Sequence, residues 1–280
     1  MIMFYNSYSK IHTSIVGRND QVHAFHLVDP SPWPITAAFS ALMLTSGGVL
    51  TMHGYNPGTS ILLLGFLLLI FTKICWWRDV IREATFEGQH TSSVQTGLKM
   101  GMILFIVSEI MFFFAFFWAF FYLSVNSTSA TGGVWPPADS EILDTFQIPL
   151  LNTILLLSSG ASVTLAHESI IFKKKSQAVF GLVVTIVLAI IFTSLQGFEY
   201  VSAPFNITDS AYGSTFYMAT GFHGFHVLVG TFFLMVCFVR LYFDQFSSNH
   251  HIGFEAACWY WHFVDVVWLF LIVTIYWWGS

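Results

Sequence analysis

The sequence predicts an all-α, polytopic membrane protein of seven transmembrane helices, and two observations carry that prediction. Of the 280 residues, 55% are hydrophobic and only 9% are charged, whereas a soluble domain carries roughly 25% charged residues. Seven separate windows are also apolar over about 20 residues, the length that crosses the hydrocarbon core of a bilayer. The chain therefore lacks the polar surface of a water-soluble domain.

The seven apolar windows are separated by turn-rich or charged stretches. They run over residues 35–53, 60–77, 98–125, 148–167, 178–200, 213–241 and 254–278. No internal repeat and no shift in composition marks a second domain. We therefore expect a single transmembrane domain over residues 1–280, with residues 1–34 as an N-terminal segment on the inner side of the membrane.

The charged residues indicate how the chain is oriented. With seven helices, every Lys and Arg falls on one side of the membrane or at a helix end facing it: Lys10, Arg18, Lys73, Arg78, Arg82, Lys99, Lys173, Lys174, Lys175 and Arg240. The opposite loops carry acids instead, namely Asp139, Glu141, Asp144 and Asp209. Since loops rich in Lys and Arg stay on the inner side, we expect the N-terminus inside and the C-terminus outside.

A carboxyl group lies near the middle of the third window. No basic residue lies within a helical turn of Glu109, and removal from water favours the neutral form of a carboxyl group. Two roles are open. Glu109 is either a proton-linked or partner-facing group, or a protonated acid that hydrogen-bonds a neighbouring helix.

Histidines occur in the last two windows. His223 and His226 are three residues apart and so share a helix face, and His262 and Asp265 repeat that spacing, which allows a histidine–carboxylate pair. A haem-binding cytochrome would show paired histidines recurring on two helices, and this chain does not. Hydrogen bonds between helices are therefore the favoured interpretation, with haem ligation as the alternative.

The stretch after the second window combines basic and aromatic residues. Arg78, Arg82 and His90 follow Trp76 and Trp77. Basic side chains at the depth of the head groups suit anionic phospholipids. Positive-inside topology explains the charges but not their clustering with tryptophan, so we expect lipid contact here.

Small residues gather at two places that would allow helices to approach closely. One is the run 158–162, and the other is Gly97 with Gly101. Small residues at such spacings are typical of helix contacts in membranes.

Several longer motifs together resemble one family, subunit III of cytochrome c oxidase. The similarity runs in order from about His23 to the last residue, and its most specific motifs are Pro30–Pro34, Trp76–Val80, Met102–Glu109, Trp135–Pro137, Pro149–Thr153, Tyr212–Phe216, Gly221–His226, His262–Phe270 and Tyr276–Ser280.

The resemblance implies an accessory subunit of a respiratory haem–copper oxidase. Its first two helices would be separated from the other five by a V-shaped, lipid-filled cleft. It would contact chiefly subunit I, besides other subunits and phospholipids, and no nucleic acid. Haem a and copper, and the reduction of dioxygen by electrons from cytochrome c, would belong to subunits I and II. This chain would then carry no catalytic residue, metal ligand or cofactor, and would stabilise the catalytic subunit, support proton uptake and give dioxygen a route inward.

The resemblance also assigns roles to individual residues. Glu109 matches the family's intramembrane glutamate, and the family's lipid-contacting loop matches here at Arg78, Arg82, Glu83 and His90, next to Trp77. Gln89 and Glu168 depart from the pattern, since relatives often have histidine at both positions. This weakens detailed expectations about head-group contacts.

The compartment and the main alternative function follow. Residues 1–34 contain no apolar run of the signal-peptide kind, and the C-terminal motif resembles the mitochondrial form. We therefore expect a multi-pass protein of the mitochondrial inner membrane, with the N-terminus in the matrix and the C-terminus in the intermembrane space. A bacterial plasma membrane is the alternative.

The competing function is a secondary transporter or proton channel using Glu109, His262 and Asp265, although no inverted repeat supports it.

Overall fold

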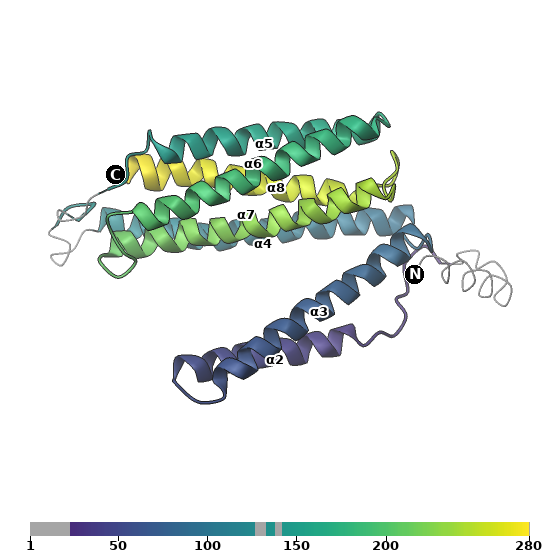
Figure 1. Cartoon of the computed structure of the whole chain (residues 1–280), viewed down its shortest axis with the longest axis horizontal. Coiled ribbons are helices and arrows are strands. Elements are labelled where there is room, and N and C mark those ends of the chain that lie inside the picture. Colours follow the sequence, from purple (N-terminus) through teal and green to yellow (C-terminus); the bar gives the residue numbers. More distant parts are fainter. Residues whose placement is uncertain (1–22, 127–132, 138–141, 280) are drawn as a thin grey trace. The chain divides into compact units, whose positions relative to one another are not determined.

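The computed structural model describes residues 23–126, 133–137 and 142–279. Within these residues it is all helical, with the helices α2 (Trp33–Met52), α3 (Gly58–Thr85), α4 (Ser92–Val125), α5 (Ile148–Ile171), α6 (Lys175–Ser202), α7 (Ala211–Tyr242) and α8 (Ile252–Leu271), the last continued by the π-helix η2 (Ile272–Trp278) (Figure 1). Seven of the described segments are long and apolar enough to cross a membrane. The predicted fold class is confirmed.

Several helices extend beyond the predicted apolar windows. α3 ends at Thr85 and α4 begins at Ser92, so the loop expected over 78–96 is reduced to residues 86–91. A hydropathy window marks only the part of a helix that suits lipid, and residues 78–85 contain no Gly or Pro to stop the helix. The turn comes at Gly88, whose φ of +67° favours glycine. Arg78 and Arg82 therefore lie on a helix and not on a loop.

Part of the charge argument falls outside the described residues. Lys10, Arg18, Asp139 and Glu141 all lie there, as does most of the N-terminal segment expected over 1–34.

The chain divides into two compact units, one ending at Gly97 and the other beginning at Leu98, and each is described by itself. In the first unit α2 and α3 form a helical hairpin in which glycines allow the backbones to meet. A Cβ at Gly65 would lie 2.6 Å from the backbone nitrogen of Leu44, and one at Gly47 would overlap the backbone nitrogen of Leu62. The indole of Trp33 also donates to the Asp79 carboxylate over 2.7 Å.

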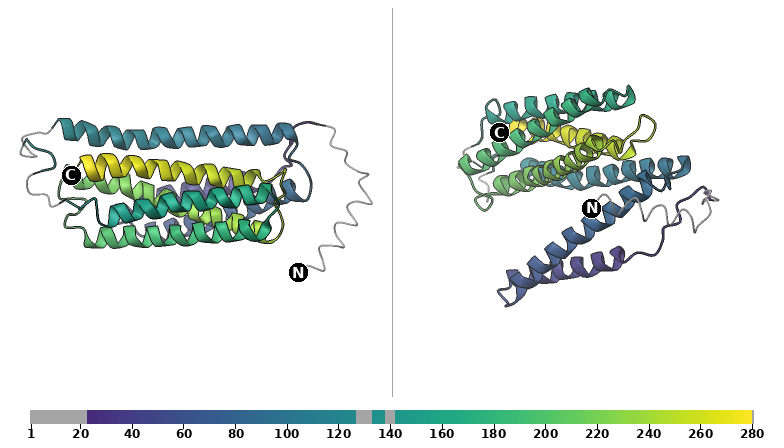
Figure 2. Two further views of the ribbon diagram at one scale, coloured as in Figure 1. Left: turned by 90° about the horizontal axis from the view of Figure 1, so that it is seen from above. Right: turned by 45° about the vertical axis from the view of Figure 1, so that its right-hand side comes forward.

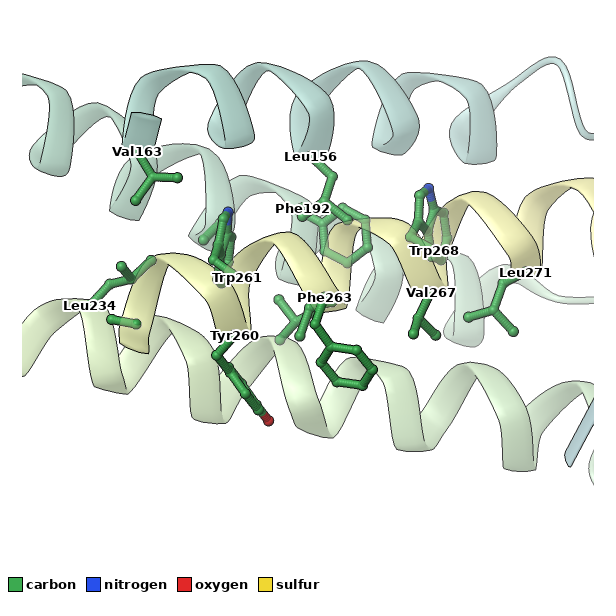
Figure 3. Close-up of a cluster of buried hydrophobic side chains, with 14 of the residues drawn as sticks. Leu156, Val163, Phe192, Leu234, Tyr260, Trp261, Phe263, Val267, Trp268 and Leu271 are labelled. Carbon is green, nitrogen blue, oxygen red and sulfur yellow. The ribbon is translucent and has the colours of Figure 1, made fainter. Parts of the chain in front are cut away.

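In the second unit α5, α6, α7 and α8 run side by side (Figure 1; Figure 2). The segment α8–η2 is the most buried, with 61% of its most apolar window buried against 39% or less for the other helices. Trp261 and Trp268 point from α8 toward α5, while Tyr260 and Phe263 lie on another side of α8 (Figure 3). α8 is thus the helix around which this unit is packed.

Two tryptophans of α8 are also hydrogen-bonded to α5. Trp261 Nε1 donates to Ser159 Oγ over 2.9 Å, and Trp268 Nε1 donates to Thr153 Oγ1 over 3.0 Å. Ser159 lies in the predicted small-residue run 158–162, so that run does form a close helix contact. Gly97 and Gly101 have no non-local neighbour within 4 Å of an added Cβ, so they do not mark a close contact within this chain.

Candidate functional site

The intramembrane carboxyl of Glu109 on α4 has a partner on α7. Its Oε2 lies 2.7 Å from Nε2 of His226, and the side chains are 22% and 9% exposed, respectively. Nδ1 of His226 lies 2.6 Å from the carbonyl oxygen of Phe222. Since that carbonyl can only accept, Nδ1 carries a hydrogen and donates it. Nε2 and the carboxyl group therefore share one proton between them, as an imidazolium–carboxylate pair or as a neutral acid–imidazole pair.

Aromatic rings lie next to this pair. The ring centroid of Phe113 is 4.9 Å from that of His226, and Phe112 and Phe116 lie 5.1 and 5.0 Å from Phe222. An apolar wall lowers the local dielectric and strengthens the interaction between the two polar groups.

The other histidine of α7 faces a different helix. His223 is buried, and its Nε2 lies 3.1 Å from the carbonyl oxygen of Val264 on α8. Its ring packs 5.1 Å from that of Trp268. His223 and His226 therefore bind separate partners, and both ring nitrogens of His226 are engaged. This geometry does not offer the two histidines as ligands to a common haem.

His262 and Asp265 of α8 face α5 but do not hydrogen-bond each other in the described structure. His262 Nε2 lies 3.3 Å from Thr164 Oγ1. A Cβ at Gly160 would lie 3.0 Å from Asp265 Oδ2 and 3.7 Å from the His262 ring. The histidine–carboxylate pair allowed by the sequence is thus replaced by two separate contacts with α5. Among the described side chains, none bridges Glu109 and Asp265, so no hydrogen-bonded path between them supports the transporter hypothesis.

A third intramembrane carboxyl group, in addition to those of Glu109 and Asp265, lies on α6. Glu199 of α6 is buried, and its Oε1 accepts from the hydroxyl of Tyr276 over 2.6 Å. That hydroxyl also accepts from Gln196, whose amide oxygen in turn accepts from Asn152 over 3.4 Å. The only signal in the sequence is the three-residue spacing of Gln196 and Glu199. It gives no hint of partners on α5 and η2.

The predicted lipid-contacting residues lie in the first unit. Trp77 is 60% exposed, and the side chains of Arg78 and Arg82 are 66% and 58% exposed. Arg78 is paired with Asp79 at 2.7 Å, and Arg82 with Glu87 at 3.3 Å. Exposed ion pairs of this kind contribute about 0–1 kcal/mol, so a phosphate group can compete for the guanidinium groups.

The remaining two residues of that set are more enclosed. Glu83 lies 3.4 Å from Nε2 of His26, and the His90 ring contacts the same His26 ring at 6.4 Å. The structure therefore brings Glu83 and His90 to one histidine, and it leaves Trp77, Arg78 and Arg82 on the exposed part of α3.

Seven candidate membrane spans, an aromatic core and isolated polar pairs define a polytopic membrane subunit. The family model described as Cytochrome c oxidase subunit III matches residues 23–280. Proteins named Cytochrome c oxidase subunit 3 are similar along nearly the whole chain. The one from Pylaiella littoralis is 64% identical over 259 residues, covering 92% of this chain and 95% of the relative. The proteins from Triticum aestivum and Arabidopsis thaliana are 60% and 59% identical over 260 residues, each covering 93% of this chain and 98% of the relative.

The chain belongs to the cytochrome c oxidase subunit III family. It is a membrane-embedded, non-catalytic subunit of an oxidoreductase complex, and the redox metal centres of that complex are held by other subunits. The resemblance drawn from the sequence motifs is confirmed.

Proposed function

We propose that this subunit stabilises the haem-bearing subunit I and supports proton uptake by the complex, while electron transfer from cytochrome c to dioxygen takes place in subunits I and II. The observation that carries the proposal is the Glu109–His226 pair at 2.7 Å, which shares a proton inside a membrane helix bundle. Among the described residues, no hydrogen bond connects this pair to another carboxyl group. This favours a local proton-holding role over a complete path for proton conduction. The dioxygen route and the lipid-filled cleft stay predictions.

Contact with a partner or with lipid is supported by the outer face of α4. Phe114 is 57% exposed, Trp118 is 65% exposed and Met111 is 61% exposed. A helix that buries so little of its apolar surface in its own chain needs lipid or another subunit to cover it. We assign part of this surface to subunit I.

Phospholipid binding is proposed for Trp77, Arg78, Arg82, Glu83 and His90. The support is the exposed guanidinium groups of Arg78 and Arg82 beside an exposed tryptophan at the end of a membrane span. Arginine offers several N–H donors to phosphate oxygens, and tryptophan favours the head-group region.

We place the protein in the mitochondrial inner membrane, with its N-terminus in the matrix and its C-terminus in the intermembrane space. The orientation is supported by basic residues at the end of α3, at the start of α4 and in the turn between α5 and α6, with Asp144 and Asp209 in loops of the opposite side. The compartment is supported by the C-terminal motif, which resembles the mitochondrial form.

Replacing Glu109 by Gln tests the proton-linked role. Gln can hydrogen-bond His226 but cannot take up or release the proton, so the oxidase should assemble with normal haem content and normal initial turnover, and then lose activity severalfold faster during sustained turnover. Glu168→Gln, which changes an exposed carboxyl group of the same chain, is the matched control.

Two outcomes would contradict the proposal. Complete loss of activity in a fully assembled Glu109→Gln complex would show that the residue is not accessory. Inactivation at the control rate would show that the Glu109 carboxyl has no part in proton supply.

A further inference from the structure

Two histidines and a glutamate meet where α5 ends and α8 begins, away from the groups discussed above. His167 lies in the last turn and a half of α5, His251 is the N-cap of α8, and Glu255 follows one turn later. One potential ligand atom from each lies within 4.8 Å of the other two. All three residues belong to the second unit, and His251 is 8% exposed.

The orientation of His251 is fixed by its other nitrogen. Nδ1 lies 2.9 Å from the carbonyl oxygen of Ser247, so Nδ1 carries the hydrogen and Nε2 presents a lone pair to the cluster. A histidine that binds a metal through one ring nitrogen usually donates the N–H of its other ring nitrogen to a carbonyl or carboxylate group. The His167 ring is also held, because it stacks on Phe254 with centroids 6.0 Å apart.

The distance between the two histidines fits a shared metal ion. Their Nε2 atoms are 3.3 Å apart. Two nitrogens bound tetrahedrally to Zn²⁺ at about 2.0–2.1 Å would be separated by about 3.3–3.4 Å. The same distance also fits a hydrogen bond in which Nε2 of His167 donates to the lone pair of His251 Nε2, and a bound metal ion would take the place of that hydrogen.

Glu255 completes the set of three ligands. Its Oε1 lies 3.8 Å from Nε2 of His251, and its Oε2 is held by the ammonium group of Lys99 at 2.7 Å. A shift of about 0.5 Å would bring Oε1 to tetrahedral spacing from Nε2 of His251, and the three ligand atoms already lie within 4.8 Å of one another. Lys99 adds a positive charge, and the exposed carboxylate of Glu168 adds a negative one next to His167. With the carboxylate of Glu255 included, the group without metal therefore carries a net charge of about −1, which favours a cation.

We propose that His167, His251 and Glu255 bind one divalent transition-metal ion of the Zn²⁺ class, with water as a fourth ligand. Two neutral imidazoles and one carboxylate suit Zn²⁺ better than Mg²⁺ or Ca²⁺, which prefer oxygen ligands only. The ion links the end of α5 to the start of α8, the most buried helix of this unit. The proposal does not depend on the role of Glu109.

Metal binding by the purified oxidase complex tests the proposal. The complex is first stripped with a chelator and then dialysed against radioactive Zn²⁺, and bound zinc is counted per haem a. We expect His167→Gln and His251→Gln each to remove one zinc per complex or to weaken its binding at least tenfold. His250→Gln, at the neighbouring position outside the cluster, should bind zinc like the unsubstituted complex.

A diffraction measurement keeps the proposal testable if a variant fails to assemble. Anomalous scattering at the zinc edge from the unsubstituted complex should give a peak between His167 and His251. The proposal is overturned if zinc is found only on other subunits, or if an assembled His167→Gln complex binds as much zinc, as tightly, as the His250→Gln control.

Discussion

The two arginines near the end of α3 make the lipid proposal testable on single side chains. Both guanidinium groups are more than half exposed, and they form surface ion pairs with Asp79 and Glu87. A basic residue near an anionic membrane surface contributes about 1 kcal/mol to lipid binding. Replacing Arg78 and Arg82 together by Gln should therefore weaken anionic phospholipid binding by about 2 kcal/mol.

Native mass spectrometry of the assembled complex would count the bound phospholipids. The charge-conserving double variant Arg78→Lys and Arg82→Lys is the control, and it should retain most of the lipid. An unchanged lipid count in the Gln double variant would remove these arginines from the lipid site.

Individual residues could be found in the sequence more readily than their partners. Glu109 and His226 were both recognisable as polar groups in apolar windows, but they are 117 positions apart. Nothing in one sequence states which faces of α4 and α7 meet. His262 and Asp265 show the opposite error. Their spacing allowed a pair, yet packing turned both side chains against Gly160 of α5.

Among the secondary-structure elements, the α2–α3 hairpin offers a matched pair of neighbouring glycines, of which Gly47 lies at the helix contact and Gly48 does not. A Cβ at Gly47 would overlap the backbone of Leu62, whereas a Cβ at Gly48 would meet only the Leu62 side chain at 3.9 Å. Gly47→Ala should therefore separate the two helices and lower the amount of assembled oxidase. Gly48→Ala should be tolerated or slightly stabilising, since Ala favours helix by about 1 kcal/mol over Gly.

The matched pair is compared by the amount of haem a that co-purifies with this chain at a fixed expression level. Equal yields from Gly47→Ala and Gly48→Ala would contradict the close helix contact.

The helices themselves were the most predictable feature, because apolar length is a local property. Their ends were less predictable. The charged residues 78–85 continue α3 although they lack the hydropathy of a membrane span, and η2 replaces the last α-helical turns of the seventh window. Hydropathy also could not show that α8 is buried and α4 largely exposed, since both are apolar enough to span a membrane and the more exposed α4 has the higher mean hydropathy. That difference arises only when helices pack.

At the level of the whole molecule, the central claim is that this chain supports an oxidase whose redox chemistry lies elsewhere. His223 and His226 of α7 bind the Val264 carbonyl and Glu109, and His262 of α8 contacts Thr164 of α5. The family places the chain in a complex in which other subunits hold the metal centres.

The most direct test is the reduced-minus-oxidised visible spectrum of the mildly solubilised oxidase, recorded before and after this chain is stripped away. We predict that the haem a signal stays with the remaining subunits at unchanged intensity. If the haem a signal instead leaves with this chain, the assignment of a non-catalytic role is contradicted, and His223, His226 and His262 become candidates for haem ligation.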